Sequence, residues 1–138
     1  MTVTMYLQYS FFSGKQIRSD ISFLHFIWNK LINEESIAII SLLDSKVFEK
    51  FPNLKIIIPH GGGAIPYQMG RFRSWSVRKP RMEFFDDWLK RLHFDTCNYD
   101  KLALELLFKT VGVDSVLFAT EKPGTGSGRD PKTGLDYD

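Results

Sequence analysis

The stretch FPNLKIIIPHGGG, residues 51–63, indicates the fold class. Its centre, residues 54–58, is a short β-branched run that is apolar almost throughout, which predicts a strand buried on both faces in a parallel sheet. The strand ends at Pro59, and His60 with three glycines follows directly. Functional residues of α/β proteins collect where strands end, so this junction is the first candidate for a functional site.

On the N-terminal side of this strand, the sequence predicts one helix. Asn33 is a favourable cap, and Glu34 and Glu35 fall in the first turn, where the helix dipole favours negative charge. Pro52 stops the helix. The apolar residues that recur at helical spacing between these limits are Ile37, Ile40, Leu43, Val47 and Phe51.

On the C-terminal side, helices and strands continue to alternate. Alternation of this kind predicts βαβ units and a parallel sheet with right-handed crossovers. A parallel sheet needs helices over both of its faces or closure into a barrel. Three strands with helices between them complete neither arrangement, so we expect an incomplete structure. The predicted elements are helices over 65–75 and 81–89, a strand over 92–96, a helix capped by Asp100, a strand over 116–119 and a loop over 123–138.

Composition excludes several classes of protein. The net charge is only +2 and the basic residues are dispersed, whereas nucleic-acid binding needs a concentrated basic surface, so we expect no nucleic-acid partner. No apolar run reaches the roughly 18 residues of a membrane span, and the N-terminus has no secretory-signal pattern. Cys97 is the single cysteine, which fits a reducing compartment, and the cytoplasm is the expected location.

Each predicted strand is followed by polar side chains that can do chemistry. His60 follows the first strand and can be a metal ligand or a general base, or a structural histidine bonded to a loop carbonyl. Glu121 follows the last strand and can bind a divalent metal or activate water, or be a solvated glutamate paired with Lys122. Because parallel strands end at one edge, the pattern predicts that His60 and Glu121 share a rim.

Other polar residues carry weaker expectations. Cys97 can be a tuned thiol, but a small buried hydrophobe is the alternative. We expect Asp95 to meet a backbone or arginine partner within its strand, and His93, at the start of that strand, to be structural. Arg71 and Arg73 can hold a substrate carboxylate as planar forks, or lie on the surface.

Several motifs resemble one known family. They are the segments 51–67, 70–73 (GRFR), 94–99 (FDTCNY), 116–121 (VLFATE) and 128–134 (GRDPKTG). Together they resemble the amidohydrolase-related family, in its aminocarboxymuconate-semialdehyde decarboxylase branch. They are most similar to the 4-oxalomesaconate hydratase-like members, in which glutamate replaces the more usual aspartate after the last strand. The resemblance covers residues 31–138, which we predict to be the C-terminal part of a barrel domain. Residues 1–30 are left unassigned.

The resemblance implies a fold and a site. The fold is a distorted (β/α)8 TIM barrel, of which this chain would hold strands six to eight. By resemblance, His60 is the histidine after strand six, and Glu121 is the acidic residue after strand eight, at or near a metal that is usually zinc. The family's other ligands are a His-x-His pair and a histidine after strand five. No His-x-His occurs in the chain, while zinc needs at least three protein ligands.

Three hypotheses follow. In the first, the chain is part of a metal-dependent enzyme that decarboxylates or hydrates a small carboxylate-rich acid, and is inactive alone. His60 would then be the base or water-positioning group, Glu121 a ligand or base, and Arg71 and Arg73 carboxylate holders. In the second, it is a non-catalytic remnant that associates with a complementing chain or with itself through open strand edges. In the third, it binds a phosphate or nucleotide at the glycines before a helix.

Overall fold

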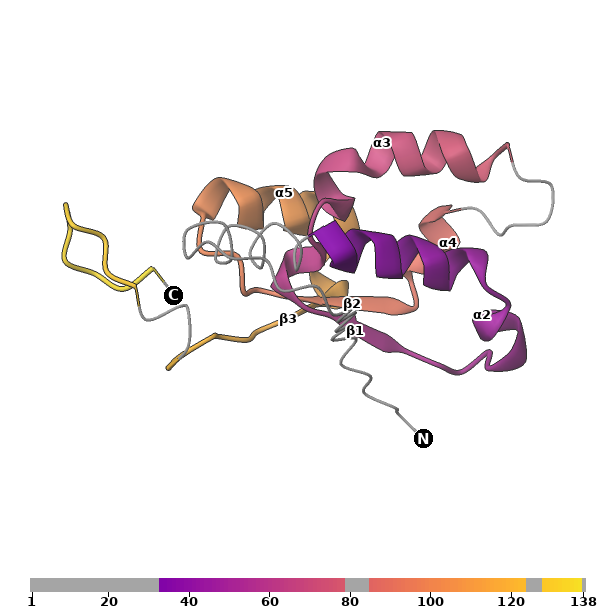
Figure 1. The fold of residues 1–138 in the computed structure, drawn as a ribbon, viewed down its shortest axis with the longest axis horizontal. Coiled ribbons are helices and arrows are strands. Elements are labelled where there is room, and N and C mark those ends of the chain that lie inside the picture. Colours follow the sequence, from indigo (N-terminus) through magenta and orange to yellow (C-terminus); the bar gives the residue numbers. More distant parts are fainter. Residues whose placement is uncertain (1–32, 79–84, 124–127, 138) are drawn as a thin grey trace, which may run out of the picture.

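A computed structural model describes residues 33–78, 85–123 and 128–137 (Figure 1). The unassigned segment 1–30 therefore lies outside the described residues. So do residues 81–84 of the helix predicted over 81–89. None of the described helices is long and apolar enough to cross a membrane.

The described strands form one parallel sheet. β1 (Ile56–Ile58), β2 (Leu92–Asp95) and β3 (Val116–Leu117) lie in the order β1-β2-β3, so chain order and spatial order agree. In the register, Ile57 is opposite His93, and Phe94 is opposite Val116. The predicted parallel sheet is confirmed, although β3 is shorter than the strand expected over 116–119.

Helices connect these strands. The chain runs from a helix over residues 33–44 into α2 (Val47–Lys50), and after β1 through η1 (His60–Gly62) to α3 (Ile65–Ser76) and α4 (Phe85–Leu89). After β2 come α5 (Lys101–Val111) and η2 (Val113–Ser115). The predicted cap of α5 is confirmed, because the Asp100 carboxylate accepts a hydrogen bond from the Ala103 amide at 2.9 Å.

The helices lie on one side of the sheet in Figure 1. The side chains that face them are fully buried, as with Ile56 and Phe94 at 0% exposure, and they form one core with Phe85 and Leu107. Ile57, which alternates with its buried neighbours along β1, is only partly buried. The expectation of a strand buried on both faces therefore holds for one face, and the arrangement is that of part of an α/β barrel.

The predicted continuous helix before β1 is wrong in one respect. It breaks after residue 44, where the Ser45 hydroxyl donates to the Leu42 carbonyl and accepts from the Val47 amide, so that α2 starts in a new direction. The buried face of the helix also differs in part from the predicted one. Leu43, predicted for the apolar face, is buried at 2% exposure, but Ile37 and Phe51, predicted for the same face, are 64% and 58% exposed. Ile39 and Phe48, which were not predicted for that face, are buried in the core.

Candidate active site at the carboxyl edge of the sheet

The chain turns sharply where β1 ends. His60 has φ 51°, in the left-handed region that non-glycine residues rarely adopt, and Gly61 and Gly62 follow at φ 61° and 86°. A Cβ on Gly62 would lie 2.7 Å from two ring carbons of Phe94, so only glycine fits there. The Gly63 amide closes the turn on the His60 carbonyl at 3.2 Å. The glycine run therefore lets the loop pass close over β2 and fixes the backbone of His60.

Asp95, at the end of β2, ties this loop to the neighbouring strand. Its Oδ1 accepts hydrogen bonds from the amides of Gly61 at 3.0 Å and Cys97 at 3.2 Å, and the residue is 8% exposed. The predicted backbone partner is confirmed. Because a buried carboxylate needs such donors, Asp95 is occupied by holding the two strand ends together.

The His60 ring lies between two carboxylates. Its Nδ1 is hydrogen-bonded to Glu35 Oε1, and its Nε2 lies 2.9 Å from Glu121 Oε1. The Tyr99 hydroxyl donates to the other oxygen of Glu121. Four segments thus contribute one chain of hydrogen bonds: the helix over 33–44, η1, the loop after β2 and the loop after β3. The predicted proximity of His60 and Glu121 is confirmed.

Thr96 positions the segment that leads to Glu121. Its hydroxyl donates to the Ala119 carbonyl at 2.9 Å and accepts from the Ala119 amide at 3.0 Å. β3 itself ends at Leu117, so this side chain continues the link between the second and third strands where the backbone ladder stops.

These contacts change the acid–base behaviour of His60. The hydrogen bond to Glu35 raises the pKa of His60 to about 9, against the opposing effect of burial, and the charge of Glu35 and the contact with Glu121 add to the rise. At neutral pH the ring is therefore an imidazolium that donates from both nitrogens. In this state His60 can release a proton but cannot accept one.

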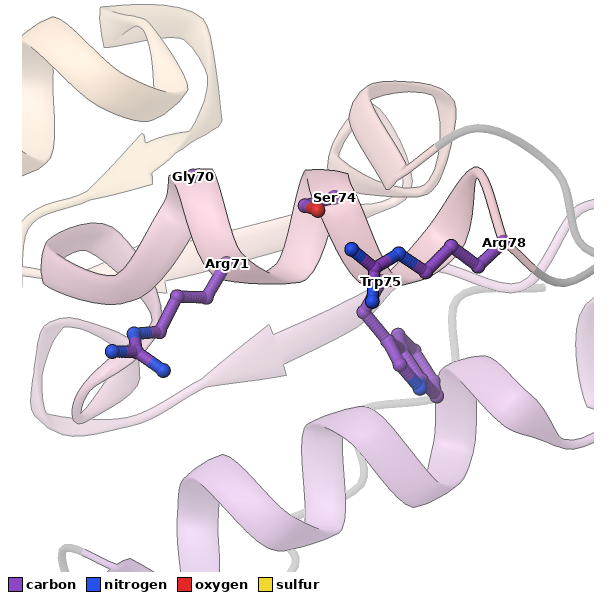
Figure 2. Close-up of a pocket in the computed structure, with 5 residues that line it drawn as sticks. All are labelled: Gly70, Arg71, Ser74, Trp75 and Arg78. Carbon is purple, nitrogen blue, oxygen red and sulfur yellow. The ribbon is translucent and has the colours of Figure 1, made fainter.

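The remaining predicted residues lie elsewhere. Arg73 is engaged by Asp86 of α4, with Nε at 2.9 and 3.1 Å from the two carboxylate oxygens and Nη2 at 2.6 Å from one. Arg71 is exposed on α3 and borders a shallow pocket of about 330 Å³, which Figure 2 shows with Arg78, Trp75 and two small residues. The structure does not bring either predicted carboxylate holder into contact with His60.

Three further expectations concern neighbouring polar residues. Cys97 is buried, with a backbone link to Asp95. Burial and then the charge of Lys55 lower the pKa of His93, whose Nδ1 is buried without a hydrogen-bond partner. Glu121 is not paired with Lys122, which instead binds Asp136 at 2.7 Å.

A second pocket, of about 510 Å³, opens beside the site. It lies between the ends of β2 and β3 and one face of α5, and Tyr99 lines it as well as contacting Glu121. Its walls also include Asn98, Lys101, Phe108, Phe118 and Tyr137. A small organic molecule at this place would contact Tyr99, whose hydroxyl donates to Glu121.

The described residues do not form a complete metal site. They contain no group of three His, Cys, Asp or Glu side chains that could hold a metal ion. Both nitrogens of His60 are bonded to carboxylates, and both oxygens of Glu121 are hydrogen-bonded as well, so a metal ion at Glu121 would replace one of these contacts. Since zinc sites use at least three protein ligands, further ligands would have to come from outside the described residues.

Two members of the site escaped the sequence reasoning. Glu35 was predicted only as part of a helix first turn, and Tyr99 was included only in the motif at residues 94–99. Glu35 is 25 residues from His60, and no local pattern connects a helix start to the end of the following strand. The available signal was the combination of a buried strand, a histidine at its end and an acidic first turn in the preceding helix.

A histidine and carboxylates at the carboxyl edge of a parallel α/β sheet occupy the place where functional residues of α/β barrels lie. The profile of the amidohydrolase family matches residues 24–138, so the chain belongs to the amidohydrolase family. It is 38% identical over 106 residues to the 2-keto-4-carboxy-3-hexenedioate hydratase of Sphingobium sp., covering 75% of this chain and 30% of the hydratase.

Other relatives support the same branch of the family. The 2-amino-3-carboxymuconate-6-semialdehyde decarboxylase of Caenorhabditis elegans is 35% identical over 97 residues, covering 66% of this chain and 24% of the decarboxylase. The crystal structure of 4-oxalomesaconate hydratase from Rhodopseudomonas palustris matches with a TM-score of 0.70 and 41% identity, over 78% of this chain and 33% of that one. The chain thus spans about a third or less of the length of these relatives.

A more distant structure holds a metal. The dihydroxybenzoic acid decarboxylase from Polaromonas sp. JS666, with bound manganese, matches with a TM-score of 0.60 over 78% of this chain and 37% of that one. At 22% identity this match supports the shared barrel fold alone. The bound manganese is a property of that decarboxylase.

Proposed function

We propose that the chain contributes one side of the active site of a metal-dependent amidohydrolase that hydrates or decarboxylates a small carboxylic acid. The observation that carries the proposal is the placement of His60 between Glu35 and Glu121 at the carboxyl edge of the sheet. Functional residues of α/β barrels lie at this edge. The hydratase and decarboxylases among its relatives supply the reaction types.

His60 and Glu121 would act as an acid–base pair. Hydration of a carbon–carbon double bond takes one proton from water and delivers one to carbon, and decarboxylation replaces the departing carboxylate on carbon by a proton. The imidazolium of His60 is suited to deliver a proton from Nε2, which faces the rim. The carboxylate of Glu121 is suited to accept one from water, so the two roles divide between neighbouring groups.

The substrate would be an acid held by arginine. Arg71 and Arg73 stay our candidates for the carboxylate contact, since planar guanidinium forks match carboxylates. Arg71 is the stronger of the two, because the fork of Arg73 is occupied by Asp86. The relatives named for dicarboxylic and tricarboxylic acids support a substrate of this class.

A divalent metal, zinc or manganese, would complete the site, with Glu121 as one ligand. The metal would polarise the substrate or lower the pKa of bound water. Because the described residues offer too few ligands, we expect the purified chain to bind zinc no tighter than about micromolar affinity. Competition with a chromophoric zinc chelator measures this affinity. Stoichiometric zinc that survives dialysis against a chelator would contradict it.

Complementation tests the activity. The full 138-residue chain is co-purified with the portion of the Rhodopseudomonas palustris hydratase that it does not align with, and hydration of 4-oxalomesaconate is followed by loss of its conjugated absorbance. We expect metal-dependent turnover that is lost in His60→Asn and Glu121→Gln, and retained in the control Glu34→Gln. Turnover that survives both site substitutions would refute the proposal.

Two further proposals concern the setting of the chain. The predicted division into an N-terminal segment 1–30 and a barrel part 31–138 stays a proposal, as does location in the cytoplasm, which the single cysteine favours. A non-catalytic subunit is the second candidate function, and the short donor set for a metal favours it. Failure of complementation together with stable association of the two chains would support that second candidate.

A further inference from the structure

Glu35 reaches the site from the helix over 33–44, whose other buried side chains pack in the core. Its side chain is only 10% exposed, and its Oε2 is buried without a hydrogen-bond partner. A carboxylate at the start of a helix is normally solvated. Burial of its charge costs free energy unless a hydrogen-bonding or charged partner offsets the lost hydration. The partner is His60 Nδ1, bonded to Oε1. The position of this carboxylate is therefore explained by the His60 ring and by no other described contact.

The next residue fixes the helix against the same loop. The Ser36 hydroxyl accepts a hydrogen bond from the Ala64 amide at 2.9 Å, just after the glycine run. Glu35 and Ser36 thus join the start of the helix over 33–44 to both ends of the segment 60–64. Because His60 also has a left-handed backbone that the loop holds in place, backbone and ring are restrained separately, the first by the loop and the second by Glu35.

This geometry leaves one ring nitrogen for chemistry. A carboxylate on Nδ1 keeps a proton there and sets the plane of the ring, which directs Nε2 to the opposite side. On that side Nε2 meets Glu121 at 2.9 Å. We propose that Glu35 is the positioning residue of His60, which holds its Nδ1 proton and directs its Nε2 to the rim where Glu121 lies. The catalytic consequence of this inference rests on the function proposed above, but the structural part does not.

The structural part is tested on the full 138-residue chain by NMR. A proton on Nδ1 held by a buried carboxylate exchanges slowly and resonates at low field, and His60→Asn identifies it by its loss. We expect Glu35→Ala to remove this resonance and to change the contacts of the His60 ring protons, while Glu34→Ala, one residue away in the same turn, leaves both unchanged. An unchanged resonance in Glu35→Ala overturns the proposal.

A second variant covers the case in which Glu35→Ala does not fold. Glu35→Gln keeps the shape of the side chain and an acceptor oxygen but removes the charge. We expect the Nδ1 proton to move upfield and exchange faster, because a neutral acceptor makes a weaker bond than a carboxylate. The same position and exchange rate as in the unchanged chain would overturn the proposal.

The catalytic consequence is read in the complemented enzyme. Substitution of a group that orients another commonly costs about 10- to 100-fold in activity, so we expect Glu35→Ala to lower kcat by that factor with little change in KM, and Glu35→Asp to recover part of it. Full activity in Glu35→Ala would overturn the positioning role. Loss of the NMR resonance without any turnover in the unchanged complex would support positioning and refute the proposed function instead.

Discussion

At the scale of single residues, the site depends on backbone geometry as much as on side chains. His60 and the two glycines after it all have positive φ, and Gly62 passes directly over the ring of Phe94. Phe94 is fully buried in the core. The close approach of the loop to β2 is thus what places the imidazole at the rim.

Alanine at Gly62 tests this close approach. The new methyl group would meet two Phe94 ring carbons at 2.7 Å, and we expect Gly62→Ala to lower the free energy of unfolding by about 3 kcal/mol or more. Gly61→Ala is the matched control, because its φ is also positive but its nearest contact is the Asn98 side chain at 3.3 Å. The control should cost about 1–2 kcal/mol. Urea unfolding measures both, and equal losses would show that the Phe94 contact is unimportant.

The ion pairs of His60 predict a pH dependence of stability. Its folded pKa of about 9 exceeds the ordinary value of 6.5, so its stabilising contribution is complete below pH 6.5 and is lost as the pH rises through 9. We expect the difference in urea midpoint between the unchanged chain and His60→Asn, in the presence of a chelator, to shrink over this range. Asparagine tolerates the left-handed backbone. A difference that grows with pH would mean that His60 is neutral when folded.

Some of these site residues can be predicted from the sequence, and others cannot, for a physical reason. Strand-end position predicted that His60 and Glu121 meet, and a buried strand carboxylate predicted the backbone bonds of Asp95. Glu35 could not be found in this way, because its local role in a helix first turn already explained it. Contacts between a helix start and a distant loop depend on how the helix lies on the sheet, which periodicity does not specify.

At the scale of elements, α3 and α4 are joined across their surface by one ion pair. Arg73 of α3 holds Asp86 of α4 through both Nε and Nη2, and Phe72 stacks on Phe85 beside it with ring centroids 5.6 Å apart. Both the arginine and the aspartate are partly exposed, so we expect the ion pair to contribute little to stability beside the apolar stack.

A double-mutant cycle measures that ion pair. From Arg73→Ala, Asp86→Ala and the double variant, we expect a coupling of about 0.5–1 kcal/mol in urea unfolding, at the upper end for exposed pairs because two bonds form. The single-bonded pair Lys90–Asp87 is the control, with a smaller coupling. A coupling no larger than that of the control would free Arg73 for the substrate-binding role predicted from the sequence.

The elements themselves were predicted well where pattern and capping agree. Asp100 begins α5 as its position indicates, and α3 lies close to its predicted range. The helix before β1 was predicted too long because Val47 and Phe51 continue the helical spacing of its apolar residues in the sequence. Ser45 ends it through its hydroxyl, and two local side-chain hydrogen bonds of this kind outweigh a weak periodic signal.

At the scale of the whole molecule, the described sheet has an open edge at β3. β3 pairs with β2 on one side, and no other described strand pairs with it. Phe118, directly after β3, is 87% exposed, and Leu117 in β3 is 39% exposed. Unpaired strand edges with exposed apolar neighbours promote association between chains.

We therefore expect the purified chain to self-associate through this edge. Sedimentation velocity should show oligomers whose proportion rises with concentration, and Phe118→Ser should reduce it. Ile37→Ser is the control, since Ile37 is also well exposed, at 64%, but lies on the helix over 33–44. A monomer at all concentrations, or equal effects of the two substitutions, would contradict the prediction.

The double hydrogen bond of Thr96 to Ala119 has a wider consequence. Backbone pairing between the second and third strands stops before the rim, and one hydroxyl takes over. The position of the segment that carries Glu121 therefore depends on a partly buried side chain and not on the backbone ladder. A change of this one side chain is expected to move the acidic group at the rim while the packed core beneath keeps its arrangement.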